Sequence, residues 1–226
     1  MLYCIDSKLL FYSFNVSTSF KVLLMRSVLF NNAIILTLCL LVFFLQPDSH
    51  QWFAYYHSGI EKGQWWRLLT AHICHTNGYH FLLNAVGLVV VSTLFLETFK
   101  KISLLAASLF SALFISTCLF LLEPDLQWYV GLSGVLHAIF AIGVCDELKK
   151  ADKWGLILAV GFLIKIAFEQ FNGPSLMTES LIAATVLVNA HLYGAIAGIL
   201  YFLMMPFWKK CSLRQNNAKN SVKSNK

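Results

Sequence analysis

The feature that most constrains this chain is a series of long apolar runs from which charged residues are almost absent. Six such runs can be read along the sequence: Ser27–Leu45, His80–Phe99, Ile102–Leu122, Leu132–Cys145, Trp154–Phe168 and Leu181–Met205. The longer runs approach or exceed the ~20 residues that a helix needs to cross a bilayer. They are continuous, unlike the alternating strands of a membrane barrel, so they predict helices. We therefore expect an all-α membrane protein with six transmembrane helices.

The distribution of positive charge predicts the orientation of these helices. Lys and Arg together number 17, and all but Lys62, Arg67 and Lys165 lie in one alternate set of segments, which includes both ends of the chain. Because Lys- and Arg-rich segments stay in the cytoplasm, both termini are expected there. The net charge of +6 is then a signal of topology and requires no nucleic-acid partner.

The apolar body, residues 27–208, is flanked by two segments of different composition. Residues 1–26 are expected to form a cytoplasmic N-terminal segment, with Met25 as an alternative start of the protein. Residues 209–226 are polar and basic, which predicts a disordered cytoplasmic tail. The six cysteines are scattered without a CxxC pair, so we interpret them as small apolar residues in lipid-buried helices.

Polar residues at membrane depth are informative, because they are costly there and usually functional. We estimate depth from a helix rise of about 1.5 Å per residue, counted from the cytoplasmic end of each run. Ser133 then lies about 20 Å up the fourth run, His191 about 21 Å up the sixth and Asn84 about 24 Å up the second. His80 lies one turn above Asn84 on the same helix face. Three helices thus bring polar groups to one level, which predicts a constructed site.

The fourth run is too short to cross a bilayer alone. The preceding loop, residues 127–131, must therefore dip into the membrane, where irregular backbone is tolerated only against protein or a water-filled cavity. Small residues recur at four-residue spacing in the fourth and sixth runs: Gly134 with Ala138, and Gly194 with Gly198. Such pairs allow two helix backbones to approach closely. That approach would bring Ser133 within hydrogen-bond reach of His191.

A serine beside a histidine is the arrangement of a nucleophile with its base. Ser133 begins a helix, whose free N–H groups favour a developing oxyanion, and His80 and Asn84 could add side-chain donors. No acidic residue lies at the same level by this count, so we expect a Ser–His dyad without a carboxylate. His137 lies one turn after Ser133, and either packs against or orients His191, or forms a helix–helix hydrogen bond.

These residues fall into four motifs. The motifs are Trp66-Arg67, an HxxxxHxxxN pattern of His75, His80 and Asn84, a GxSG pattern at residues 131–134, and an AHxxGxxxG pattern at residues 190–198. In this order and spacing, over about residues 65–200, they resemble the rhomboid family of intramembrane serine proteases. Each motif alone is weak, but the four together are highly specific.

The resemblance implies a role for each matching residue within a rhomboid-like bundle of six transmembrane helices. Ser133 and His191 would be the catalytic dyad, and His80, Asn84 and the Ser133 amide would form the oxyanion hole. Other matching residues would have structural roles. His75 and Arg67 would support the outer loop, and His137 would lie behind His191. The glycines of the motifs would be Gly131, Gly134, Gly194 and Gly198. Rhomboids often carry an aromatic residue at the position of His137, and commonly a glycine within residues 186–189.

The compact body and the sequence GLSGVLH, residues 131–137, resemble the rhombosortase subgroup more narrowly. That resemblance implies membrane-anchored protein substrates with a C-terminal transmembrane tail of the GlyGly sorting type. It places the enzyme in the inner membrane of a Gram-negative bacterium and implies no cofactor.

Several alternatives remain from the sequence. A metal site is disfavoured, because zinc proteases need a glutamate in HExxH and none occurs here. Lys165 and Glu169, four apart in the fifth run, are either a weak surface pair with a snorkelling lysine or a device for substrate entry. The competing function is that of an inactive rhomboid-like protein that binds membrane clients. A small transporter would need a continuous polar path, but the inner halves of these runs are apolar.

Overall fold

The computed structural model describes residues 7–151 and 153–205, with side chains from residue 25 on. Four of its helices are long and apolar enough to cross a membrane, and a bent pair of helices, Arg67–Ile73 with Gly78–Leu94, makes a fifth candidate. The remaining predicted span, the fourth, is the helix α8 (Ser133–Lys149), which at 17 residues is the short one expected. The count of six therefore stays a prediction, while the helical architecture is confirmed.

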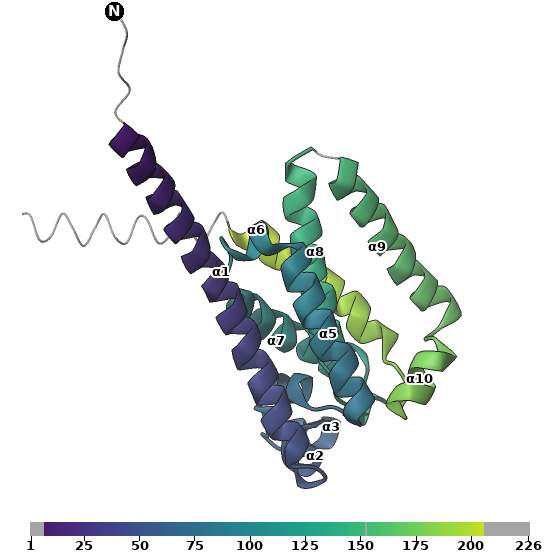
Figure 1. Cartoon of the computed structure of the whole chain (residues 1–226). Helices are drawn as coiled ribbons and strands as arrows, with labels where there is room; N and C mark the ends of the chain where they lie inside the picture. The colour runs from purple at the N-terminus through teal and green to yellow at the C-terminus, as the bar shows by residue number, and fades with distance from the viewer. Residues whose placement is uncertain (1–6, 152, 206–226) are drawn as a thin grey trace, which may run out of the picture.

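Helix α1 (Ser7–Phe44) is the long helix at one side of the bundle (Figure 1). It begins well before the predicted span, and its apolar part is Met25–Phe44. It packs against α5 (Gly78–Leu94). Within this contact the Asn32 side chain donates a hydrogen bond of 2.8 Å to Ser92 Oγ. A polar pair buried between two apolar helices fixes their register, because either partner alone would be left unsatisfied.

A layer of short elements lies at one end of the bundle, between α1 and α5. These are α2 (Asp48–Phe53), β1 (Tyr55–Tyr56), α3 (His57–Glu61), α4 (Arg67–Thr70) and the 3₁₀ turn η1 (Ala71–Ile73). Strand β1 pairs antiparallel with β2 (Trp128–Tyr129), which comes just before α8. This pairing holds the 127–131 loop against the body of the protein, as its predicted position within the membrane requires.

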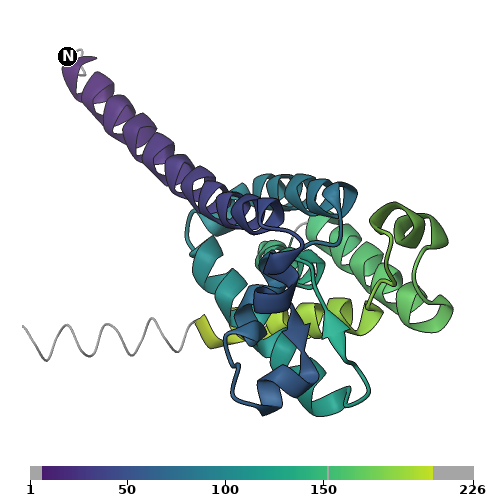
Figure 2. The same ribbon diagram turned by 90° about the horizontal axis from the view of Figure 1, so that it is seen from below.

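Helix α7 (Leu104–Leu122) and helix α8 form the centre of the molecule. Ser103 caps α7, since its hydroxyl accepts a hydrogen bond of 3.2 Å from the Ala106 amide. The short α6 (Leu96–Phe99) follows α5 on the opposite end of the bundle from the α2–η1 layer (Figure 1). Seen from below, α1 extends away from this compact group (Figure 2).

The last part of the chain differs from the prediction. Helix α9 (Lys153–Asn172) is followed by α10 (Leu176–Ile182), and the final described helix, Val188–Met205, begins only after a break. We call that final helix the His191 helix. The predicted start of the sixth span at Leu181 is wrong, because Ala183 takes a left-handed conformation (φ 52°) that ends α10.

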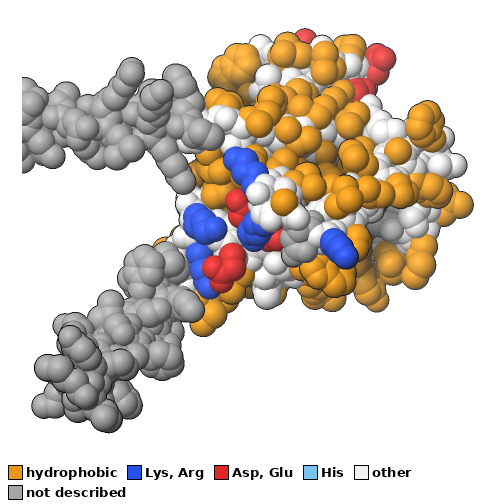
Figure 3. All heavy atoms as spheres, turned by 90° about the horizontal axis from the view of Figure 1, so that it is seen from above, with side chains coloured by type: hydrophobic (Ala, Val, Ile, Leu, Met, Phe, Trp, Pro, Cys, Tyr) orange, Lys and Arg blue, Asp and Glu red, His pale blue; other side chains and the backbone are white. Residues whose placement is uncertain are grey.

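The outer surface of the bundle is suited to lipid. The share of α9 buried inside the protein is 11%, and apolar side chains such as Leu163 (65% exposed) and Phe171 (88% exposed) cover it. Charged side chains instead gather on the end of the bundle where the α8–α9 turn lies (Figure 3). They include the exposed ion pairs Lys100–Glu97 and Lys150–Glu147. Such a separation of apolar sides from a charged end is typical of a protein embedded in a bilayer.

Candidate active site

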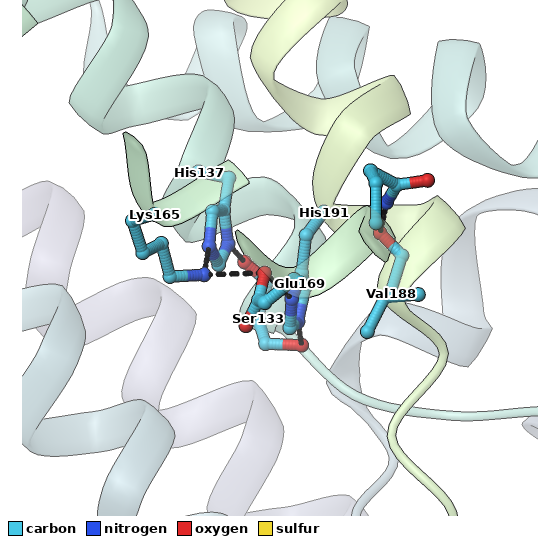
Figure 4. A network of polar contacts seen from close by, with 7 residues as sticks. Ser133, His137, Lys165, Glu169, Val188 and His191 are labelled. Carbon is cyan, nitrogen blue, oxygen red and sulfur yellow. Dashed lines mark hydrogen bonds and ion pairs between the residues drawn. The ribbon is translucent and has the colours of Figure 1, made fainter. Parts of the chain in front are cut away.

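Ser133 and His191 meet at the centre of the bundle. Ser133 is the first residue of α8, and His191 lies one turn into the His191 helix. The Ser133 Oγ and the His191 Nε2 are 3.0 Å apart (Figure 4). His191 is buried, with 6% of its surface exposed. Distance and burial match those of a serine whose hydroxyl proton is taken by a neighbouring imidazole.

Glycines allow the two helices to come this close. A Cβ atom added to Gly134 would lie 2.9 Å from the Ala190 carbonyl oxygen. One added to Gly194 would overlap the Gly134 carbonyl, and one added to Gly198 would overlap that of Ala138. The close approach predicted from the four-residue spacing is therefore confirmed, and side chains at these positions would push Ser133 away from His191.

The loop before Ser133 is irregular but well satisfied. Gly131 has φ +125°, which residues with a side chain rarely adopt, and a Cβ there would lie 2.8 Å from the His80 ring. The Gly131 amide donates to the Ala71 carbonyl at 3.1 Å. Its carbonyl accepts a hydrogen bond of 3.0 Å from the Tyr129 hydroxyl.

His80 and Asn84 face a cavity that Ser133 and His191 also line. This cavity has a volume of about 560 Å³ and lies between α5, the β2–α8 loop and the segment that follows α10. The His80 Nδ1 is 3.3 Å from the Thr76 amide and 3.1 Å from the Thr76 hydroxyl. With the amide as donor, the neutral ring carries its proton on Nε2. Asn84 uses one amide hydrogen on the His80 carbonyl at 3.1 Å and keeps the second. Asn84 therefore retains a donor, and His80 retains one in this tautomer.

Two further residues have the positions expected of structural supports. The Arg67 guanidinium, 6% exposed, donates at 2.6 Å to the Gln64 side chain and to the Ala54 and Gln51 carbonyls. The backbone carbonyl of His75 accepts a hydrogen bond from His50 Nε2 at 2.9 Å and another from Gln46. The His75 ring nitrogens have no partner among the described residues, so its backbone, and not its ring, ties the loop.

A carboxylate lies beside His191, which corrects the prediction of a site without one. The Glu169 Oε2 is 3.0 Å from His191 Nδ1, on the side of the ring opposite Ser133 (Figure 4). The same oxygen accepts a hydrogen bond of 2.7 Å from Lys165 Nζ. The count of helix rise considered only the acids of the fourth run and the outer loop. Of the two interpretations of Lys165 and Glu169, the weak surface pair does not fit Glu169, whose side chain is only 18% exposed.

His137 completes this network. Its ring stacks on the ring of His191, with centroids 4.1 Å apart and planes inclined by 13°. Its Nδ1 donates a hydrogen bond of 2.7 Å to the Ser133 carbonyl, and its Nε2 contacts Lys165 Nζ. A lysine and a glutamate four apart within an apolar run, opposite a histidine on another run, are the sequence signal that could have revealed the network.

The same residues have the ligand types of a metal site. One ligand atom from each of His137, Glu169 and His191 lies within 4.8 Å of the other two. The Lys165 ammonium, however, already contacts His137 and Glu169. A cation would have to displace it against like-charge repulsion, so the arrangement favours a proton network over a metal centre.

Comparison with known proteins adds an independent result. A profile of the Rhomboid domain matches residues 62–206, well over half of the chain. The Rhomboid-like protein 11, chloroplastic, of Arabidopsis thaliana is 27% identical over 172 residues, 70% of this chain and 58% of that protein. The putative rhomboid protease YdcA of Bacillus subtilis is 23% identical over 145 residues, 64% of this chain and 69% of that protein.

Proposed function

The chain is a multi-pass membrane protein of the rhomboid family, and on this premise we propose that it is an intramembrane serine endopeptidase. The observation that carries the proposal is the 3.0 Å contact between Ser133 Oγ and His191 Nε2 beside a cavity within the membrane-spanning bundle. A helix–helix hydrogen bond alone would require neither the cavity nor the additional donors that line it.

The proposed reaction begins with attack on a substrate carbonyl in the cavity. As the Ser133 Oγ forms a bond to the carbonyl carbon, its proton moves to His191 Nε2. The tetrahedral intermediate then breaks its C–N bond, and the same proton passes from His191 to the leaving amine. A water molecule repeats the sequence on the acyl-enzyme, with His191 again accepting a proton, and releases the new carboxyl end.

The negatively charged oxygen of the tetrahedral intermediate must be stabilised by hydrogen-bond donors. The donors that we propose are the His80 Nε2–H, the second Asn84 amide hydrogen and the backbone N–H of Ser133, which all belong to residues that line the cavity. Such a set stabilises the oxyanion more than the ground-state carbonyl, which is what accelerates the reaction. In this proposal His75 and Arg67 support the outer loop that precedes α5, the helix that carries His80 and Asn84.

For the substrate we propose a membrane-anchored protein with a C-terminal transmembrane tail of the GlyGly sorting type. The proposal draws on the resemblance of residues 131–137 to the rhombosortase subgroup. We further propose an inner-membrane location with both termini in the cytoplasm. The charged end of the bundle shown in Figure 3, which carries the α6–α7 and α8–α9 connections, supports this orientation.

The test is to co-express the wild type, Ser133→Ala or His191→Ala with a substrate that carries such a tail, and to follow the tail by immunoblot. We expect cleavage by the wild type only. Equal cleavage by the wild type and Ser133→Ala would show that Ser133 is not the nucleophile. If no variant cleaves, the tail assignment is wrong and ordinary rhomboid substrates are tested next. Stable binding of clients without cleavage of any of them would identify an inactive rhomboid-like protein.

A further inference from the structure

The contacts around His191 allow one consistent assignment of hydrogens, which starts from Lys165. Its ammonium group can only donate, so both His137 Nε2 and Glu169 Oε2 accept from it. His137 must then carry its proton on Nδ1, where it meets the Ser133 carbonyl at 2.7 Å. Each of these three contacts then joins a donor to an acceptor, with His137 neutral and Glu169 ionised.

The same reasoning fixes the tautomer of His191. Glu169 Oε2 is an ionised carboxylate oxygen and can only accept, so His191 Nδ1, at 3.0 Å, carries the proton. The other nitrogen, Nε2, is then free to accept the Ser133 hydroxyl proton at 3.0 Å. The opposite tautomer would place a proton on Nε2, where a base needs a lone pair, and would leave Nδ1 with no hydrogen for the carboxylate.

The position of the carboxylate also suits the charge that develops during the reaction. When His191 accepts the serine proton it becomes a cation, and Glu169 lies directly against its Nδ1–H. Lys165 neutralises Glu169 in the resting state, so the buried carboxylate does not remain as an isolated charge within the bundle. Three helices supply the three groups: Ser133 comes from α8, His191 from the His191 helix and Glu169 from α9 (Figure 4).

From this geometry we propose that Glu169 is a positioning residue that completes a Ser133–His191–Glu169 triad. It holds His191 in the tautomer that accepts the serine proton, and it stabilises the imidazolium that follows. Lys165 balances the charge of Glu169. The inference rests on the proposed protease function and assigns to α9 a part in the chemistry, in addition to its part in the bundle.

The kinetic test uses the purified full chain in detergent, with a transmembrane substrate and a fluorophosphonate probe that labels active serines. For Glu169→Gln we expect kcat and the labelling rate to fall by about 10²- to 10⁴-fold, the range set by losing the carboxylate of a serine triad. KM should change little, because the lost interaction belongs to the transition state. Glu169→Asp, which keeps the charge, should recover part of the rate.

Lys165→Met separates a positioning role from a merely structural ion pair. If the pair only joins helices, Lys165→Met and Glu169→Gln should reduce kcat equally, and that outcome would overturn the proposal. We expect Lys165→Met to keep kcat within about tenfold of the wild type, and the double variant to resemble Glu169→Gln. Thermal unfolding of each variant controls for loss of fold.

The tautomer of His191 provides a readout that does not depend on proteolysis. In ¹⁵N-histidine-labelled protein the His191 signals are identified by their absence from His191→Gln. We expect the Nδ1–H tautomer in the wild type and a mixture in Glu169→Leu, which has no acceptor. If Glu169→Leu changes the His191 tautomer in this way, but the wild type neither cleaves substrate nor reacts with the probe, the protease function alone is refuted. A His191 tautomer unaffected by Glu169→Leu would refute the role of Glu169.

Discussion

At the scale of single residues, the amide of Asn84 is the clearest candidate for an oxyanion donor. Asn84→Ala should lower kcat by about 10²- to 10³-fold with little change in KM, because the donor acts on charge that appears only in the transition state. The matched control is Asn172→Ala. Asn172 makes the same contact to the carbonyl four residues earlier, at 3.1 Å, but on the exposed side of α9. Cleavage kinetics of both variants decide the matter, and equal losses would refute the donor role.

Gly131 offers a second prediction at this scale. Gly131→Ala combines an unfavourable positive φ with a Cβ 2.8 Å from the His80 ring, so it should displace His80 and lower kcat at least tenfold. Gly173 also has a positive φ, +77°, but a Cβ there has no atom within 4 Å. Gly173→Ala should therefore cost stability alone. If the two variants have the same kcat, backbone strain and not the His80 contact explains Gly131.

The sequence predicts some of these residues better than others, for a physical reason. Ser133, His191, His80 and Asn84 could be placed at one depth because helix rise converts residue number into height. Glu169 is missed because the count of helix rise is not applied to the fifth run, where it gives about 24 Å for Glu169, the level of Asn84. Height alone also does not give the direction in which a side chain points. The contact of Glu169 with His191 depends on the rotation of α9, which only packing against α8 determines. The surroundings of the His75 ring, whose nitrogens have no hydrogen-bond partner among the described residues, likewise depend on packing that a count along the helix does not give.

At the scale of helices, the glycine contacts between α8 and the His191 helix lead to a third prediction. Gly198→Ala places a Cβ against the Ala138 backbone, so the helices must separate. Such overpacking costs about 1–3 kcal/mol of unfolding free energy, and the cleavage rate should fall with it. Gly161→Ala is the control, because a Cβ on Gly161 of α9 meets nothing within 4 Å. Thermal unfolding in detergent measures both, and an unchanged Gly198→Ala would contradict the close-packing argument.

The start of the His191 helix is a boundary that the hydropathy of the sequence does not predict correctly. The apolar run that starts at Leu181 continues through residues 183–187, although the chain there is not helical. Hydropathy cannot distinguish that segment from helix, because it is apolar for another reason: several of its residues line the cavity beside Ser133. Two hydrogen bonds from the residues just before α5, Thr76 Oγ1 to the Ile182 carbonyl and Asn77 Nδ2 to the Leu181 carbonyl, hold the end of α10 from which this segment continues. Long-range contacts of this kind leave no local pattern in the sequence.

At the scale of the whole molecule, apolar sides and a charged end define how the protein lies in a bilayer. The α2–η1 layer is at one end, and the α6–α7 and α8–α9 connections are at the other (Figure 1). The cavity is lined in part by Trp128 and Tyr129, whose strand β2 pairs with β1 of that layer. The site lies nearer to the first end, so water and substrate would reach it from the side of the membrane away from the positive charges. For the proposed protease, orientation would decide which domains of a substrate are released and on which side of the membrane.

This orientation gives the last prediction, in a bacterial host and in a background without native cysteines. Single cysteines are placed at Lys62, between α3 and α4, and at Lys101, between α6 and α7, both of which are exposed. A membrane-impermeant maleimide added to intact spheroplasts should label Lys62→Cys, whereas Lys101→Cys should react only after permeabilisation. Retained cleavage activity shows that each variant is folded. The reverse pattern would mean that the positive segments face outward, and the proposed release of substrate domains would then be on the opposite side.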